Sequence, residues 1–152
     1  MLGPDVALRI PHRAHSCIRV GFVPLLDAAP LLLAREAGLF EREGVPVDLQ
    51  LQPGWATVRD KLAHREIDLS HCLAGLLFGA RAGVGSLPVD VVTGMLLNTH
   101  GNSICLARRL LPLAGPDGSG LGGALRSQRL QAPLVFGVVH LLSSHLLILR
   151  SW

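Results

Sequence analysis

The alternation of apolar and polar positions near the start of the chain predicts a strand followed by a helix. Residues 18–23 form a short, mostly apolar run that stops at Pro24, which is typical of a buried strand. Over residues 31–40, leucine, alanine and phenylalanine then recur at helical spacing. Pro30 stands near the first turn of this helix and Gly44 just past its end, which are the positions that these residue types favour.

The next segment repeats this order of elements. Apolar and polar side chains alternate along residues 46–52, which indicates a half-buried strand at the edge of a sheet. Trp55, Val58 and Leu62 are spaced three and four residues apart, so they share one face of a second helix. Such a strand–helix–strand unit predicts a right-handed crossover in a parallel sheet, where ligands bind beyond the carboxyl ends of the strands. The turn over residues 54–57 stands at such an end.

Shorter patterns continue the alternation of strands and helices. Strands are predicted over residues 67–70, 89–97, 102–107 and 134–139, and helices over residues 73–82 and from His145, where Ser143 and Ser144 would supply a cap. The glycine-rich stretch between Pro112 and Gly123 predicts a flexible linker. The sequence therefore predicts an α/β chain, with a mainly parallel sheet and flanking helices.

These patterns divide the chain into four parts. We expect a loose N-terminal leader over residues 1–16, a first α/β lobe over residues 17–107, a Gly/Pro-rich linker over residues 108–133, and an incomplete start of a second lobe over residues 134–152. The last predicted helix stops at Trp152 after about two turns, which indicates a fragment of a longer fold.

Composition and charge exclude several function classes. Of the 152 residues, 49% are hydrophobic and 16% are charged, which excludes a wholly disordered chain. The net charge is +3, but the basic residues are scattered, so nucleic-acid binding is not expected. Cys17, Cys72 and Cys105 lack a C-x-x-C spacing, which argues against a disulfide framework or a zinc ribbon. His64 and His71 beside Cys72 lack a fourth ligand at a useful spacing, so no metal site is predicted.

No segment is expected to cross a membrane. Residues 1–16 contain no apolar run of signal-peptide length. Residues 133–149, the most hydrophobic window, fall short of the roughly 20 residues that a transmembrane helix needs. As sequenced, the chain is therefore expected in the cytoplasm.

Several short motifs follow one another in the order and spacing of a known family. In the first part of the chain they are Val20-Gly21-Phe22-Val23-Pro24-Leu25, Asp27-Ala28-Ala29-Pro30, Ala37-Gly38-Leu39-Phe40, Trp55-Ala56-Thr57-Val58-Arg59-Asp60-Lys61, Ile67-Asp68 and Leu97-Asn98-Thr99-His100-Gly101-Asn102-Ser103-Ile104. Later motifs are Phe136-Gly137-Val138-Val139, Ser144-His145 and Leu149-Arg150-Ser151-Trp152. The chain thus resembles the nitrate- and bicarbonate-binding proteins of ABC transporters. The resemblance implies the first lobe and the start of the second lobe of a type II periplasmic-binding-protein fold.

This resemblance implies capture of a small oxyanion in a cleft between two lobes, with nitrate favoured over nitrite or bicarbonate. Nitrate only accepts hydrogen bonds, so its site must present donors in a region of low dielectric. The backbone amides of Trp55, Ala56 and Thr57 lie at a helix N-terminus, where the helix dipole favours an anion. The Trp55 indole and the Thr57 hydroxyl add donors, and the resemblance adds Asn102 and His145.

Each candidate also has a structural interpretation. Trp55 is equally suited to the core, Asn102 to a tight turn after a glycine, and His145 to the start of a helix. Asp27 is expected to be a local cap rather than a ligand, because its carboxylate would repel an anion.

The resemblance implies a binding protein rather than an enzyme, with no cofactor. Its partners would be the permease and ATPase of an ABC transporter, and its location periplasmic or membrane-associated. A cytoplasmic nitrate sensor that regulates an antitermination partner is the alternative, and it agrees with the lack of a visible signal peptide. An enzyme of thiamin-pyrimidine synthesis type shares the fold, but the chain lacks the Cys-rich run that it would need.

Overall fold

The computed structural model describes residues 17–99, 101–127 and 133–152, so the predicted leader over residues 1–16 lies outside the described residues. Contacts divide the chain into two units. Unit 1 runs to Cys72 and includes Leu76–Asn98, and unit 2 consists of Leu73–Gly75 and Thr99–Trp152. Each unit has its own helices and its own buried apolar side chains.

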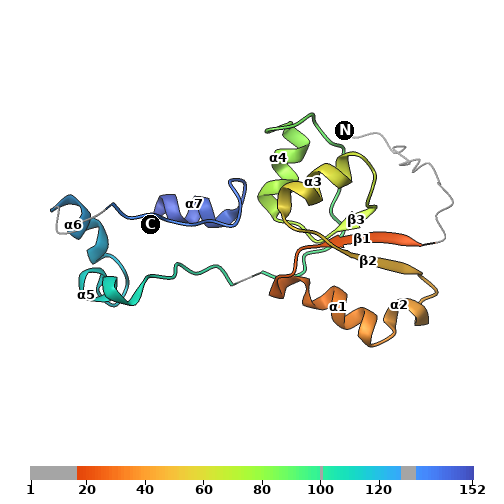
Figure 1. The fold of residues 1–152 in the computed structure, drawn as a ribbon, viewed down its shortest axis with the longest axis horizontal. Coiled ribbons are helices and arrows are strands. Elements are labelled where there is room, and N and C mark those ends of the chain that lie inside the picture. The colour runs from red at the N-terminus through yellow and green to blue at the C-terminus, as the bar shows by residue number, and fades with distance from the viewer. Residues whose placement is uncertain (1–16, 100, 128–132) are drawn as a thin grey trace, which may run out of the picture. The chain divides into compact units, whose positions relative to one another are not determined.

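Unit 1 is built on a parallel sheet (Figure 1), in which the described strands are β1 (Ile18–Phe22), β2 (Val47–Leu51) and β3 (Leu69–Ser70). The strand order is β2-β1-β3, with β1 in the centre. These strands confirm the predictions over residues 18–23, 46–52 and 67–70, and β2 lies at an edge, as its alternation predicted. A mixed α/β fold with a parallel sheet is therefore confirmed.

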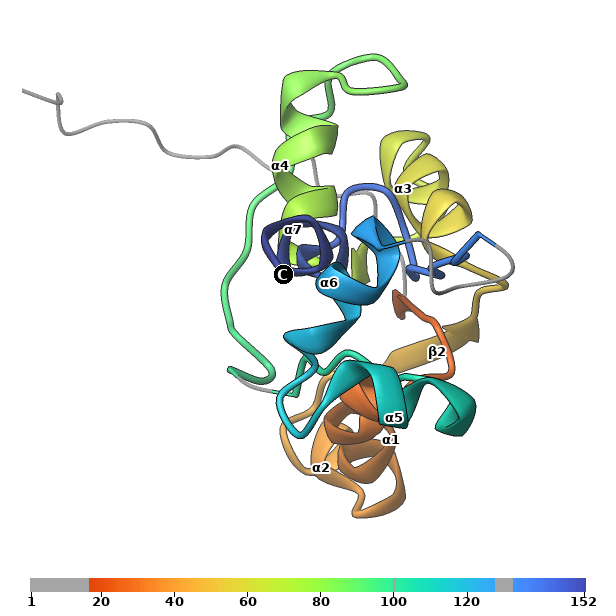
Figure 2. The ribbon, with the colours of Figure 1, turned by 90° about the vertical axis from the view of Figure 1, so that its left-hand side faces the viewer.

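Helices cover both faces of this sheet. They are η1 (Leu26–Ala28), α1 (Ala29–Glu36) and α2 (Leu39–Arg42) after β1, α3 (Trp55–Ala63) after β2, and α4 (Ala74–Ala82) after β3. Helices α1 and α2 lie on one face, and α3 and α4 lie on the other (Figures 1 and 2). The helix predicted over residues 31–40 is broken at Gly38, whose φ of 63° no helical residue adopts.

The core of unit 1 lies between the sheet and these helices. Its buried apolar side chains are Val20, Phe22, Val23, Ala28, Trp55, Val58, Ile67, Leu76 and Ala80. Gly21 in β1 allows the closest approach, because a Cβ atom there would lie 2.6 Å from Ile67 Cδ1 and 3.3 Å from Gln52 Cγ. The absence of a side chain at Gly21 thus lets Gln52 lie over the central strand.

Unit 2 is helical where the sequence predicted a flexible linker. Its helices are η2 (Arg108–Leu110), α5 (Leu111–Ala114), α6 (Gly120–Arg126) and α7 (Ser144–Ser151). Ala114 of α5 and Leu121 and Ala124 of α6 are buried. The prediction of flexibility between Pro112 and Gly123 is therefore wrong for the helical residues, whereas the role of residues 108–133 as a linker between lobes stays a prediction.

Close packing explains two of the glycines in this stretch. A Cβ atom on Gly120 would lie 2.6 Å from the backbone oxygen of Leu113, so the start of α6 can approach α5 only without a side chain. Gly118 has a φ of +80°, and a Cβ atom there would lie 2.6 Å from Trp152 Cζ2. These glycines serve tertiary contacts, which composition alone cannot distinguish from flexibility.

Two alanine substitutions in α6 test this interpretation. We expect Gly120→Ala to lower the free energy of unfolding by about 1 kcal/mol or more, because the new methyl group overlaps a backbone oxygen. Gly123→Ala is the matched control. Apart from the backbone of its own helix, no atom of the described residues lies within 4 Å of its Cβ position, and alanine favours a helix over glycine by about 1 kcal/mol. Urea unfolding followed by circular dichroism measures both changes, and equal effects of the same sign would contradict the packing account.

Three predicted strands do not form. Residues 89–97, 102–107 and 134–139 have no strand in the structure. Their apolar runs are long enough for strands, but a strand also needs a neighbour for its backbone hydrogen bonds, and no described segment provides one.

Helix α7 begins at Ser144, close to its predicted start. The residue before it, Ser143, makes no side-chain capping bond, so the predicted cap is wrong there. Across residues 17–99, 101–127 and 133–152, none of the helices has the length and apolar character needed to cross a membrane.

Candidate functional site

The carboxyl ends of the three strands in unit 1 bring several polar side chains to one edge of the sheet. Gln52 follows β2, His71 follows β3, and Asp27 lies in η1 after β1. The backbone N–H of Gln52 donates to the backbone oxygen of Phe22 at 2.8 Å, so the first residue after β2 is tied to the last residue of β1. This edge is where parallel sheets bind ligands.

The N-terminus of α3 lies at this edge and carries three predicted site residues, Trp55, Ala56 and Thr57. Its N-cap residue, Gly54, has an extended backbone and no side chain to cap the helix. The amides of the first turn of a helix have no partner within the helix, and here no side chain replaces one. This end of α3 therefore offers hydrogen-bond donors and the positive end of the helix dipole.

Trp55 is buried against a histidine. Its side chain is 4% exposed, and its indole ring meets the His71 imidazole edge to face, with ring centroids 5.0 Å apart and an interplanar angle of 62°. The core interpretation of Trp55 is therefore correct, and the residue still begins the helix whose amides form the candidate site. The two roles are compatible, because packing against His71 fixes the start of α3.

His71 has unusual surroundings for a buried imidazole. It is 5% exposed, and neither ring nitrogen has a hydrogen-bond partner in the part of the chain that the structure describes. Its Nε2 atom lies 3.7 Å from Oδ1 of Asp27. This oxygen atom is also buried and has no hydrogen-bond partner among the described residues, although the Asp27 side chain as a whole is 30% exposed. Burial lowers the pKa of His71 from its ordinary value, and the Asp27 carboxylate partly opposes this effect.

The lowered pKa of His71 makes the stability of unit 1 depend on pH. Below about pH 6.5 the unfolded chain binds a proton on this histidine more readily than the folded chain does, so we expect the free energy of unfolding to fall as pH falls through this value. His71→Gln should remove this contribution, whereas His64→Gln, at the exposed C-terminal end of α3, should retain it. Urea unfolding at several pH values measures the difference, and equal pH dependence in both variants would exclude His71 as its source.

Gln52 adds a second buried polar group at the end of β2. Its side chain is 1% exposed, and its Nε2 donates to the backbone oxygen of Gln50 at 3.2 Å, while Oε1 has no partner. Buried polar atoms without partners are rare in proteins and need an explanation. At the carboxyl edge of unit 1, a bound ligand or ordered water would explain them.

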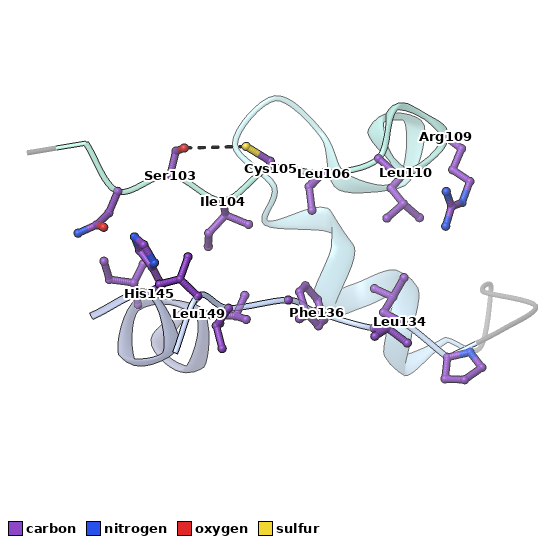
Figure 3. Close-up of a pocket in the computed structure, with 18 residues that line it drawn as sticks. Ser103, Ile104, Cys105, Leu106, Arg109, Leu110, Leu134, Phe136, His145 and Leu149 are labelled. Atoms are coloured by element: carbon purple, nitrogen blue, oxygen red, sulfur yellow. Dashed lines mark hydrogen bonds between the residues drawn. The ribbon is translucent and has the colours of Figure 1, made fainter. Parts of the chain in front are cut away.

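The other predicted site residues, Asn102 and His145, lie in unit 2. Both line a cavity of about 470 Å³, together with apolar side chains of residues 104–110 and 134–149. Figure 3 shows Ile104 and Leu106 projecting toward the segment that carries Phe136, with His145 at one end. Asn102 Nδ2 donates to Ser144 Oγ at 3.4 Å. The structure thus brings Asn102 and His145 to one cavity, and Trp55, Ala56 and Thr57 to one helix end in unit 1.

The sequence predictions missed Gln52 and His71 as site residues and treated Asp27 only as a cap. The rule that led to residues 54–57 also identifies them, because Gln52 ends one predicted parallel strand and His71 directly follows another. Their burial and their unpaired atoms, however, are visible only in the structure.

Known proteins are similar in sequence to this chain. A model of the NMT1-like family matches residues 13–152. "Nitrate import ATP-binding protein NrtC" of Synechocystis sp. is 32% identical over 138 residues, which cover 88% of this chain and 20% of that protein. "Nitrate/nitrite binding protein NrtA" of Synechococcus elongatus is 33% identical over 102 residues, which cover 62% of this chain and 23% of that protein.

"Bicarbonate-binding protein CmpA" of the same organism is 33% identical over 101 residues, which cover 61% of this chain and 22% of that protein. The chain therefore spans about a fifth of the length of these relatives. The predicted resemblance to nitrate- and bicarbonate-binding proteins is confirmed. With nearly all of its residues matched by the family model, the chain belongs to the NMT1-like family.

Proposed function

We propose that this chain is part of a solute-binding component of an ABC transporter and captures a small, singly charged oxyanion. The observation that carries the proposal is the uncapped N-terminus of α3, which Trp55 begins and which lies beside buried, unpaired polar atoms. A helix N-terminus with free amides favours an anion, and the carboxyl edge of a parallel sheet is the usual place for a ligand. The relatives named for nitrate, nitrite and bicarbonate support this ligand class.

Nitrate is the favoured ligand within this class. It has three acceptor oxygens and no proton to donate, so amides and an indole N–H can satisfy it without an acceptor from the protein. The amides of Trp55, Ala56 and Thr57 would bind the oxygens, and the indole would form one wall of the site. Asn102 and His145, which line the cavity in unit 2, stay proposed anion-binding residues.

The proposed role is binding, not catalysis. Its partners would be a permease and an ATPase, and its place the periplasm or the membrane surface. Residues 17–107 would form the first lobe and residues 134–152 would begin the second. None of the relatives named above carries a regulatory name, so they give the alternative of a nitrate sensor no support.

Titration of the purified chain with several anions tests this function. By isothermal titration calorimetry at constant ionic strength, we expect saturable binding of nitrate and of bicarbonate. Sulfate, which carries two charges and a tetrahedral shape, should bind more weakly than either. A chain that binds neither planar anion, or binds sulfate more tightly, would contradict the proposal.

A further inference from the structure

The pair formed by Asp27 and His71 has no role in the capture of an anion as described so far. Both side chains stand at the carboxyl edge of the sheet, with His71 Nε2 and Asp27 Oδ1 separated by 3.7 Å. Neither atom makes a hydrogen bond to any of the described residues. The His71 ring also touches Trp55, the first residue of the helix that would hold the anion. The pair is therefore close enough to interact electrostatically with a charge bound at that helix.

The charge of this pair opposes an anion when the imidazole is neutral. In that state Asp27 leaves one negative charge beside the site, and a second negative charge would be repelled. A proton on His71 gives the pair no net charge, because the imidazolium and the carboxylate compensate each other. With His71 protonated, a small movement from the present 3.7 Å would let Nε2 donate a charge-assisted hydrogen bond to Oδ1, so that neither atom stays unpaired.

We propose that the oxyanion binds to unit 1 together with one proton, which His71 takes up from solvent. The inference rests on the proposed function, because it concerns the same site. Burial keeps His71 neutral in the empty protein, and a bound negative charge nearby favours its charged form. The bound anion therefore raises the affinity of His71 for a proton, and by linkage the proton raises the affinity for the anion by the same factor.

The neighbours of His71 make it the suitable group for this coupling. From η1, the charged group that faces the imidazole is Asp27, whose carboxylate partly offsets the lowering of the His71 pKa by burial. From α3, the group that faces the imidazole is the indole of Trp55, which carries no charge. His64, in contrast, lies just past the other end of α3, where its Nδ1 is 2.8 Å from the backbone oxygen of Asp60. His64 is therefore a matched control in the same unit.

Nitrate is the right probe, because it carries no proton in the neutral range, whereas bicarbonate exchanges protons with the buffer. Calorimetric titrations at about pH 7 and about pH 8, each in two buffers with different heats of ionisation, give the affinity and the number of protons bound. We expect nitrate affinity to rise by up to about tenfold per pH unit as pH falls, the limit for one linked proton. Proton uptake should accompany binding.

Three variants assign the proton to its residue. His71→Gln should bind nitrate without proton uptake and with an affinity independent of pH, whereas His64→Gln should behave as the unchanged protein. Asp27→Asn should raise nitrate affinity at about pH 8, because it removes the opposing charge. It should also reduce proton uptake, because it removes the carboxylate that favours a proton on His71. NMR titration of the His71 ring should show a higher pKa with nitrate than without it, and this readout also separates His71 from His145.

The possible failures are distinguishable. Nitrate binding without proton uptake, or proton uptake that persists in folded His71→Gln, would overturn the coupling and leave the proposed function intact. An unchanged His71 ring pKa in the presence of saturating nitrate would also overturn it, even if His71→Gln does not fold. Absence of nitrate binding at every pH would overturn the proposed function, and the coupling with it.

Discussion

Replacement of Trp55 by alanine is expected to weaken nitrate binding by about ten- to a hundredfold. The change removes one wall of the proposed site and the indole N–H, and a hydrogen bond to a charged partner contributes about 1.5–3 kcal/mol. It also removes the ring that packs on His71 and fixes the start of α3. Calorimetric titration of the folded variant, beside a thermal melt, measures affinity and stability separately.

Trp152→Ala is the matched control for loss of an indole. Trp152 lies in unit 2, where its ring packs against Phe136 with centroids 6.5 Å apart. We expect its removal to leave nitrate affinity within about twofold, since its indole is not one of the proposed anion-binding donors. If Trp55→Ala lowers the melting temperature while the folded fraction keeps its affinity, Trp55 is a core residue only, and the proposed site is wrong.

Truncation of Leu76 in α4 should cause the largest loss of stability. Leu76 is 1% exposed in the core of unit 1, so Leu76→Ala removes buried methyl groups and leaves a cavity, at a cost of about 2–5 kcal/mol. Phe78, two residues along the same helix, is 72% exposed, and Phe78→Ala should change the free energy of unfolding by about 0.5 kcal/mol or less. Urea unfolding measures both, and equal losses would contradict the packing of α4 on the sheet.

The sequence predicts the first half of unit 1 well, because local patterns and tertiary structure agree there. The apolar run of β1 and the spacing of Trp55 and Val58 match the observed burial. The alternation of β2 matches it only as far as Leu49, because Leu51 is 63% exposed. A strand–helix–strand unit also permits few topologies, so the parallel sheet and the edge position of β2 follow from the same patterns.

The later strands show where local patterns fail. Residues 89–97 have the composition of a strand, yet a strand exists only through hydrogen bonds with a neighbour, and composition does not reveal the neighbour. The prediction from composition is also wrong at Gly118 and Gly120. Their glycine-rich surroundings resemble a linker, but in the structure these two residues allow close packing in unit 2. In both cases the structure depends on which other segment packs beside the residue, and composition does not identify that segment.

The candidate site was only partly predictable. The turn before α3 follows from the rule that ligands bind at the carboxyl ends of parallel strands. The burial of His71, its contact with Trp55 and the unpaired atoms of Asp27 and Gln52 depend on how three strand ends converge. To predict which strand-end residues lie together, one must know which residues of neighbouring strands pair, and periodicity within one strand does not give this.

The most direct test of the anion site is an NMR titration of the ¹⁵N-labelled chain with nitrate at constant ionic strength. The account predicts saturable shifts that are largest at the backbone amides of Trp55, Ala56 and Thr57 and at the Trp55 indole N–H, with small shifts at the exposed C-terminal end of α3. Nitrate shifts that spread evenly over the exposed amides, or that leave the first turn of α3 unchanged, would contradict it.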